Sequence, residues 1–280
     1  MAALISAATG STILDTVDPQ LYRDEATLYP SVGKVTGGFM NGSGVMISDR
    51  WVLTAGHITD FRSGGTYRVG GVNYTIDQVI GHPQHTPAFS STYDIGLLHL
   101  SSSVVGIQAA TLWHGDSASL LGREATWVGD GLTGTGLDDT RGANEMRAFT
   151  NIIDGLTPAY GLPAPSFFAD FDNPTGTSNS LVGAGSSAGA TRLEGNLTAG
   201  DSGGGVFVTL NNVSYLVGIG SYAGGFSQGM NSRYGALSGA ADLNYFHDWI
   251  FQHTGIAAVP EPSVGWMCAL GCLLAARRKR

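Results

Sequence analysis

Three short segments of this chain carry a histidine, an aspartate and a serine, in that order, and each stands in a setting that suits catalysis. They are Thr54–His57 (Thr-Ala-Gly-His), Tyr93–Leu98 (Tyr-Asp-Ile-Gly-Leu-Leu) and Gly200–Gly204 (Gly-Asp-Ser-Gly-Gly). A serine hydroxyl is a poor nucleophile at neutral pH. It needs an imidazole to accept its proton and a carboxylate to hold that imidazole in the right tautomer. One such segment is weak support, but the three together predict nucleophilic catalysis by serine.

Each of these residues alone has a simpler explanation. A serine in a glycine-rich loop is usually a turn residue, a histidine after a strand usually packs or lies at the surface, and an aspartate before an apolar run is often a cap. Gly200–Gly204 also fits the G-x-S-x-G nucleophile elbow of α/β-hydrolases. That fold places serine before its acid and histidine and follows it with a helix. Here the best histidine and aspartate lie upstream and residues 205–208 read as a strand, which argues against that fold.

The composition points to an all-β protein that does not bind nucleic acid. Of 280 residues, 13% are charged and 42 are glycine, which suits many turns between short apolar runs. The formal net charge is −8, and four of the 14 basic residues form the end of the chain at 277–280. The remaining ten basic residues face 22 acidic ones, whereas a nucleic-acid binder needs clustered Lys and Arg.

Two series of short apolar runs predict the elements that must position these groups. The first lies at 32–35, 44–47, 51–54, 67–72, 75–80 and 95–100, and the second at 125–128, 146–153, 166–171, 205–210, 214–219 and 233–237. Six short strands within about 70 residues suit a small closed antiparallel barrel. Long polar loops separate the later runs at 131–144 and 173–190, and loops of this length are usually functional or mobile. The spacing of Leu243, Phe246 and Ile250 predicts an amphipathic helix over 241–253.

The three segments and their surroundings resemble the chymotrypsin/trypsin-like serine protease family over residues 30–253. A strand at Gly42–Ile47, a turn, and then Trp51–His57 (Trp-Val-Leu-Thr-Ala-Gly-His) are how that family presents its histidine. Phe246–Ile250 is a weaker match to its C-terminal helix. The resemblance implies an all-β fold of two antiparallel six-stranded β-barrels with a C-terminal helix, and an active site in the cleft between the barrels.

The resemblance also implies the catalytic roles. His57 would be the general base, Asp94 its orienting carboxylate and Ser202 the nucleophile, while the backbone N–H groups of Gly200 and Ser202 would form the oxyanion hole. The expected activity is that of an exported serine endopeptidase acting on protein or peptide substrates without a cofactor. The alternatives are an inactive surface binding or scaffold protein on the same fold, or an esterase.

The substrate pocket implied by the resemblance consists of Asn196, Ser221, Tyr222, Ala223 and Ser232. A neutral Asn196 offers no carboxylate to a Lys or Arg side chain, and Ala223 and Ser232 should narrow the slot. We therefore expect small or medium uncharged side chains before the scissile bond.

The chain departs from the family in having no Ile-Val-Gly-Gly start. In the animal enzymes a freed N-terminal amine pairs with the acid that stands here as Asp201. Either Ile13 after processing or an internal partner could replace it.

Two polar groups could suggest metals. Asp170, Asp172 and Asn173 have an incomplete calcium-ligand spacing interrupted by proline, so a solvated acidic turn is favoured. His82 and His85 lie in the loop that leads to Asp94, and a structural role is expected for both. No metal site is predicted.

We interpret the C-terminal segment as a targeting signal that is not part of the folded domain. Pro260-Glu261-Pro262, an uncharged stretch at 264–276 and the basic end resemble the bacterial PEP-CTERM sorting signal. This implies export in a Gram-negative type of cell, transient membrane association through the tail, and its removal by an exosortase-type enzyme. A buried C-terminal helix fits four terminal cations poorly. Cys268 and Cys272 both lie in this stretch, so the globular part has no possible disulfide, and their expected role is as small apolar residues.

The N-terminal residues Met1–Ala8 are apolar and lack the basic residues that precede a signal sequence. We interpret them as the end of such a sequence, with cleavage near Ser6–Ala8. The expected organisation is therefore an N-terminal segment at 1–29, a first barrel at 30–111, a second barrel and helix at 112–253, and a linker and tail at 254–280.

Overall fold

The structure is a computed structural model that describes residues 4–6, 11–37, 40–60, 64–86, 92–138, 142–159, 161–181, 186, 189–225 and 232–260. The expected sorting tail beyond residue 260, including Cys268 and Cys272, lies outside the described residues, as does the expected cleavage region after Ser6. In the described part of the chain, no helix has the length and apolarity needed to cross a membrane.

The first half of the chain folds into a closed antiparallel barrel, as predicted. Its strands pair in the order β3-β4-β5-β8-β7-β6, and β6 closes the ring on β3. Their bounds are Val32–Gly37 (β3), Met40–Met46 (β4), Trp51–Thr54 (β5), Gly65–Val69 (β6), Val72–Gly81 (β7) and Gly96–Leu100 (β8).

The register of this barrel follows from its buried apolar residues. Val45 pairs with Leu53, and Leu53 pairs with Leu97 on the next strand. All three are fully buried, so a shift of one residue would turn the whole set out of the core.

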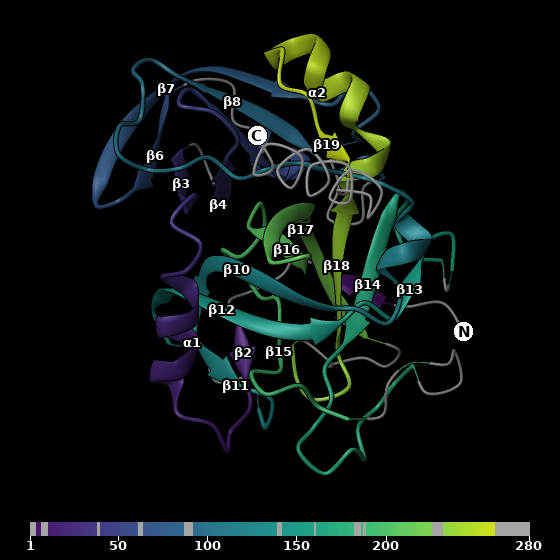
Figure 1. Cartoon of the computed structure of the whole chain (residues 1–280). Helices are drawn as coiled ribbons and strands as arrows, with labels where there is room; N and C mark the ends of the chain where they lie inside the picture. The colour runs from purple at the N-terminus through teal and green to yellow at the C-terminus, as the bar shows by residue number, and fades with distance from the viewer. Residues whose placement is uncertain are drawn as a thin grey trace, which may run out of the picture.

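The second half forms a larger antiparallel sheet, which lies below the barrel in Figure 1. Its main path runs β12-β10-β16-β17-β18-β14-β13, and β1 pairs with β17. The bounds are Leu4–Ser6 (β1), Glu124–Leu132 (β10), Asn144–Ile152 (β12), Gly155–Leu156 (β13), Ser166–Asp170 (β14), Gly205–Leu210 (β16), Val213–Gly225 (β17) and Leu237–Asp242 (β18). The two-part all-β architecture is confirmed. Within the described residues this sheet has eight strands, two more than expected, since it also gains the short strands β1 and β13.

Aromatic residues fill the core of this sheet. Trp127 on β10 stacks on its cross-strand partner Phe149 on β12, with ring centroids 5.9 Å apart. Phe167 meets the same indole edge-on from β14 at 5.8 Å. Such pairs add to the free energy of burial and fix the packing of the strands.

Residues 11–29 pack onto the second half, although no element was predicted there. Strand β2 (Thr12–Ile13) lies between β11 (Gly134–Thr135) and β15 (Gly195–Asn196), and helix α1 (Pro19–Ala26) lies against β12 (Figure 1). Asp18 caps this helix by accepting the Gln20 amide, and proline stands at its first position, where no amide donor is needed. The Asp-Pro pair is the sequence signal that marks the start of α1.

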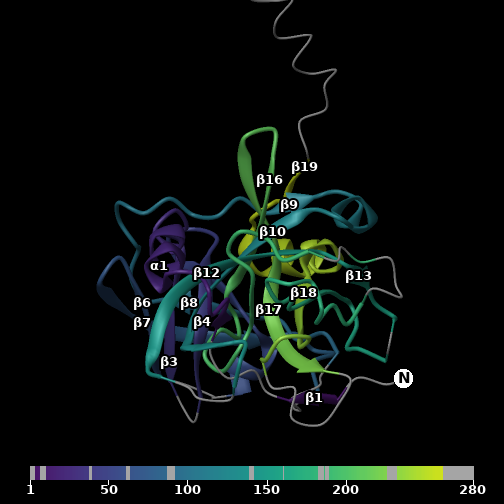
Figure 2. The same cartoon turned by 90° about the horizontal axis from the view of Figure 1, so that it is seen from below.

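The extra strand β1 lies along the outer edge of β17. Strand β1 runs antiparallel to β17, with Leu4 opposite Gly225 and Ser6 opposite Ala223. Figure 2 shows β1 beside the end of β17, at the edge of the sheet.

The C-terminal helix α2 (His247–Thr254) is shorter than the predicted helix over 241–253. β18 continues to Asp242, and a 3₁₀ turn occupies Leu243–Tyr245 before the helix begins. Gly255 ends the helix with φ 71°, a conformation that glycine adopts without strain. Ile250 packs into the core of the first barrel, and the chain then pairs β19 (Val259–Pro260) with β9 (Trp113–His114).

Candidate active site

The barrel register brings His57 and Asp94 together. His57 lies in a 3₁₀ turn that follows β5, and Asp94 comes just before β8. Because β5 pairs with β8 at Thr54 and Gly96, the two side chains meet at the same end of these strands. His57 Nδ1 lies 2.8 Å from Asp94 Oδ2, and the His57 backbone amide donates to Oδ1, also at 2.8 Å. The aspartate therefore holds both the ring and the backbone of the histidine.

Both groups are almost fully buried, and each shifts the pKa of the other. Burial lowers the pKa of His57, but the charge of Asp94 and its hydrogen bond outweigh burial and raise that pKa above its ordinary value of 6.5. Burial raises the pKa of Asp94, but the His57 charge and the hydrogen bonds that the carboxylate accepts outweigh it and lower that pKa. Asp94 is thus held as a carboxylate, as an orienting acid must be.

Two further side chains surround Asp94. The Ser221 hydroxyl donates to Asp94 Oδ2 at 2.5 Å. His85 Nδ1 lies 3.7 Å from Asp94 Oδ1, and the ring packs against Gly56, where a Cβ would come 2.8 Å from Nδ1. Ser221 was predicted as a pocket residue, and its place beside the acid was not. Nothing in the sequence around either residue signals this contact.

The loop around Ser202 is fixed against the first barrel. The Ser43 amide donates to the Ser202 carbonyl oxygen at 2.7 Å, and the Ser43 hydroxyl donates to the Gly200 carbonyl oxygen at 2.7 Å. Gly203 lies against the end of β5, where an added Cβ would come 3.1 Å from the Ala55 amide nitrogen. The serine loop therefore abuts the segment that leads into His57, although the two are far apart in sequence.

One link between these groups is not formed in this structure. His57 Nε2 is buried and accepts or donates no hydrogen bond among the described residues, while Nδ1 is engaged by Asp94. Ser202 is 4% exposed and belongs to the loop that packs beside the histidine segment. Hydrogen bonds between a nucleophile and its base are often long in ligand-free structures and tighten when substrate binds.

The backbone of the loop suits an oxyanion site. Gly200 has φ 99°, and a side chain there would also meet the Asp130 carbonyl oxygen. Among the described residues, the amides of Gly200 and Ser202 donate no hydrogen bond. Two free amides on one turn can both point at a developing negative charge.

We expect Gly203→Ala to destabilise the fold strongly. Its φ of 87° disfavours any side chain, and a Cβ would collide with the Ser43 carbonyl oxygen and the Thr54 hydroxyl. The backbone strain and the overpacking together predict a loss of about 2–5 kcal/mol in the free energy of unfolding, measured by denaturant titration. Gly106→Ala is the matched control, because φ is 80° there and the space is open, so only about 1–2 kcal/mol should be lost. Equal losses in the two variants would contradict the predicted collision.

Three of the five predicted pocket residues, Asn196, Ala223 and Ser232, lie around Leu197 and Ser238, two residues that were not predicted. Asn196 is fully buried, and its Oδ1 accepts the Ser238 hydroxyl at 2.6 Å. Ala223 is the register partner of Ser238, and the Ser232 hydroxyl donates to the carbonyl oxygen next to Asn196. Ser221 lies two residues before Ala223 on β17, and its hydroxyl donates to Asp94 instead. The fifth residue, Tyr222, packs separately with Leu162, Phe168, Leu181 and Leu237.

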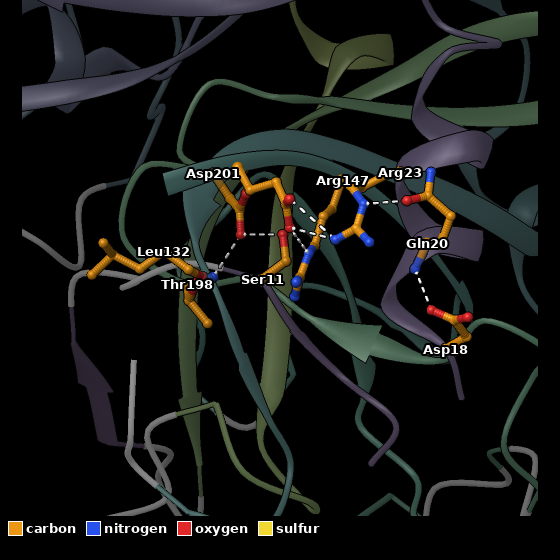
Figure 3. A network of polar contacts seen from close by, with 9 residues as sticks. Ser11, Asp18, Gln20, Arg23, Leu132, Arg147, Thr198 and Asp201 are labelled. Carbon is orange, nitrogen blue, oxygen red and sulfur yellow. Dashed lines mark hydrogen bonds and ion pairs between the residues drawn. The ribbon is translucent and has the colours of Figure 1, made fainter. Parts of the chain in front are cut away.

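Asp201 has an internal partner, which the sequence left open. The Ser11 hydroxyl donates to Asp201 Oδ2 at 2.8 Å (Figure 3). Ile13, the other candidate, is buried in β2, two residues further along the chain.

The predicted solvated acidic turn is wrong for two of its three residues. Asp170 is 1% exposed and Asp172 is 4% exposed, because β14 carries them into the second half. Asp170 accepts the Leu181 amide at 3.1 Å, and Glu194 accepts the Thr191 amide at 2.6 Å. Burial raises the pKa of Asp172 to about 7 and that of Glu194 to about 8. Among the described residues no group of three or more His, Cys, Asp or Glu side chains could hold a metal ion.

We expect the protein to lose stability as pH rises from about 4.5 to about 8. Glu194 keeps its proton in the folded state up to about pH 8, whereas the unfolded chain loses it near 4.5. The folded state therefore binds more protons throughout that window, so its stability falls with rising pH. Thermal unfolding should show a loss of about 2–4 kcal/mol across the window. Glu194→Gln should reduce this slope, and the part that remains comes from other buried acids with raised pKa values, such as Asp172 and Asp201. A slope of the same size in that variant would exclude Glu194 as its source.

The two loop histidines have different surroundings. His82 stacks on Tyr93 with centroids 5.2 Å apart and meets Phe246 and Trp249 edge-on. It thereby ties the loop before Asp94 to α2, which is the structural role expected for it. His85 lies beside Asp94 instead, as described above.

A large cavity of about 660 Å³ lies elsewhere, between α1, the β6–β7 turn and β10. Its charged lining includes Arg23, Lys34, Arg68 and Asp130, and Lys34 pairs with Asp130 at 2.7 Å. It contains neither His57, Asp94 nor Ser202, so the candidate active site is defined by side-chain geometry and not by cavity size.

Comparison with known proteins agrees with this geometry. Residues 25–161, which include His57 and Asp94, match the model of the trypsin family. The structure of HL collagenase is similar to this one with a TM-score of 0.59 at 20% sequence identity, covering 82% of this chain and 96% of the collagenase chain. At this identity the likeness shows a shared fold. The sequence match and the shared fold together support the trypsin-like serine protease family for this chain.

Proposed function

We propose that this protein is a serine endopeptidase that hydrolyses peptide bonds through an acyl-enzyme. The observation that carries the proposal is the buried His57–Asp94 pair, whose free Nε2 lies in the barrel segment that the Ser202 loop packs against. In the proposed reaction Ser202 attacks the carbonyl carbon while His57 Nε2 takes its proton. The imidazolium then protonates the leaving amine, and a water deprotonated by His57 releases the acyl group.

The other groups of the site have supporting roles in this proposal. Asp94 keeps the Nδ1 proton in place and stabilises the imidazolium. The amides of Gly200 and Ser202 donate to the oxyanion. The uncharged pocket around Asn196 binds the substrate side chain that precedes the scissile bond. No cofactor takes part.

A fluorophosphonate probe tests the proposal directly, because it reacts with a serine that a base has activated. The native protein should be labelled, and mass spectrometry should place the label on Ser202. Absence of labelling would favour the scaffold alternative. Labelling combined with hydrolysis of esters but not of peptides would favour the esterase.

We expect a peptide library to be cleaved after small or medium uncharged residues. The Asn196 amide is fully buried and already bonded to Ser238, so the pocket base carries no negative charge. Sequencing of the products gives the profile. A profile dominated by Arg or Lys would contradict this reading of the pocket.

We also propose that the protein is exported. The resemblance of the tail to a PEP-CTERM signal supports this. Mass spectrometry of cell-derived protein should find the tail removed and the protein outside the cytoplasm.

A further inference from the structure

Asp201, the residue before the candidate nucleophile, is a fully buried acid that forms no ion pair among the described residues. Its Oδ2 accepts the Ser11 hydroxyl at 2.8 Å and the Thr198 amide at 3.0 Å (Figure 3). Within the part of the chain that the structure describes, its Oδ1 has no hydrogen-bond partner, and it lies against the backbone of Gly129, where a Cβ would come 2.5 Å from it. The carboxyl is thus held on one side by two donors and on the other by packing.

Ser11 is itself fixed by the strand that follows it. It is 1% exposed, and the next two residues pair as β2 with β15 on one side and β11 on the other. The Thr12 hydroxyl also donates to the Ser232 carbonyl oxygen at 2.5 Å. The pairing of β2 with both neighbours therefore holds the Ser11 backbone beside Asp201.

Asp201 in turn determines the shape of the serine loop. Its amide donates to the Thr198 carbonyl oxygen at 3.1 Å, its carbonyl oxygen accepts the Gly204 amide at 2.8 Å, and its side chain accepts the Thr198 amide. The backbone and the carboxyl of Asp201 together thus close the 198–204 loop on itself. Gly200 and Ser202, whose amides are the candidate oxyanion donors, stand on either side of Asp201 in the sequence.

We propose that Ser11 is a positioning residue for catalysis: its hydroxyl anchors Asp201, and through it the amides of Gly200 and Ser202, in a chain that stays continuous across the Gly10–Ser11 bond. The inference rests on the proposed function and deepens it. A hydroxyl donor within the chain takes the place that a cation would otherwise fill beside a buried carboxylate. No cut before Ser11 is then needed to build the loop.

The charges around the carboxyl agree with this anchoring. Burial raises the pKa of Asp201 to about 7, and the Ser11 and Thr198 donors oppose that rise. Asp130 on β10 raises the pKa further, and Arg147 on β12 lowers it from a distance. Loss of the Ser11 donor should raise it again and weaken the loop as pH increases.

Ser11→Ala tests the proposal in the full chain. The rate of Ser202 phosphonylation and kcat should both fall about 10- to 100-fold, the scale of a lost hydrogen bond to a charged group, with KM little changed. The loss should grow as pH rises from 6 to 9. Ser11→Thr keeps the hydroxyl and should restore most of the rate. Ser31→Ala is the control, because Ser31 is also a buried serine, 5% exposed, but lies in the first half of the chain. This variant should react with the probe at the native rate.

A double-mutant cycle separates positioning from general stability. If Ser11 acts through Asp201, Ser11→Ala should have little further effect on phosphonylation in an Asp201→Asn background. A lower melting temperature with an unchanged phosphonylation rate would show a merely structural role and overturn the proposal. So would independent, additive losses in the cycle.

Peptide mapping of the labelled protein tests the continuity of the chain. The labelled molecules should yield a peptide that spans Gly10–Ser11. Labelling confined to molecules cut at that bond would overturn the proposal. If the native protein does not react with the probe at all, the proposed function fails. The anchoring of the loop by Ser11 is then tested by comparing the NMR amide chemical shifts of Gly200 and Gly203 in the native protein and in Ser11→Ala. Unchanged shifts in Ser11→Ala would then refute it.

Discussion

Replacing Ser202 with alanine should remove catalysis almost completely, with kcat for a peptide substrate reduced on the order of 10⁶-fold. No other hydroxyl takes over, because the loop around Ser202 is fixed by the Ser43 amide and by the close approach of Gly203 to β5. Progress curves with a chromogenic peptide measure the loss, and the fluorophosphonate label should disappear with it.

Ser102→Ala is the matched control for this experiment, because Ser102 is exposed and distant in sequence from the candidate site. It should keep full activity and full labelling. Persistent hydrolysis by the Ser202→Ala protein, at more than about a hundredth of the native rate, would mean that another group is the nucleophile.

Asp94→Asn should lower kcat about 10⁴-fold while the fold is retained. In the native protein the Asp94 carboxylate accepts hydrogen bonds from the His57 ring, the His57 backbone amide and the Ser221 hydroxyl. An asparagine amide can present its NH₂ group to Nδ1, which would place the ring proton on Nε2, where the base must be free. Circular dichroism should be unchanged, so that the loss reports catalysis alone.

The pH profile provides a second readout of the same variant. Asp94 raises the pKa of His57, and only the neutral imidazole accepts a proton. Activity of the native protein should therefore fall as pH drops through a value above 6.5, and the residual activity of Asp94→Asn should fall at a lower pH. If the activity of Asp94→Asn fell at the same acidic pH as that of the native protein, the assignment of His57 as the base would be contradicted.

The sequence predicts those parts of the molecule that local patterns specify. Each apolar run of the first barrel overlaps a strand, although β4 and β7 are longer than predicted and the run at 67–72 crosses the turn between β6 and β7. The Thr-Ala-Gly-His and Asp-Ile-Gly segments lie at the ends of two strands that pair. This pairing brings His57 and Asp94 into contact. The all-β fold was predictable for the same reason, since strand length and turn composition are local properties.

The contacts that the sequence did not predict join residues far apart in the chain. Ser11 and Asp201 are 190 positions apart, and Ser221 reaches Asp94 across 127. A single serine in a polar segment carries no signal of such a partner. The burial of Asp170 and Asp172 was missed because acids between polar loops usually remain in solvent, and here the amides of Ser180 and Leu181 donate to the Asp170 carboxyl. Helix α1 was missed despite its Asp-Pro start.

The strand β1 has a consequence for the behaviour of shortened forms of the protein. It pairs with the edge of β17 at Ala223–Gly225. This edge begins two residues beyond Ser221, whose hydroxyl donates to Asp94. A sheet rim without a partner offers its N–H and C=O groups to any extended backbone. Protein that lacks residues 1–10 would therefore carry an uncovered rim beside the His57–Asp94 pair. Such protein should dimerise or take up peptides through main-chain pairing, with little regard to their side chains.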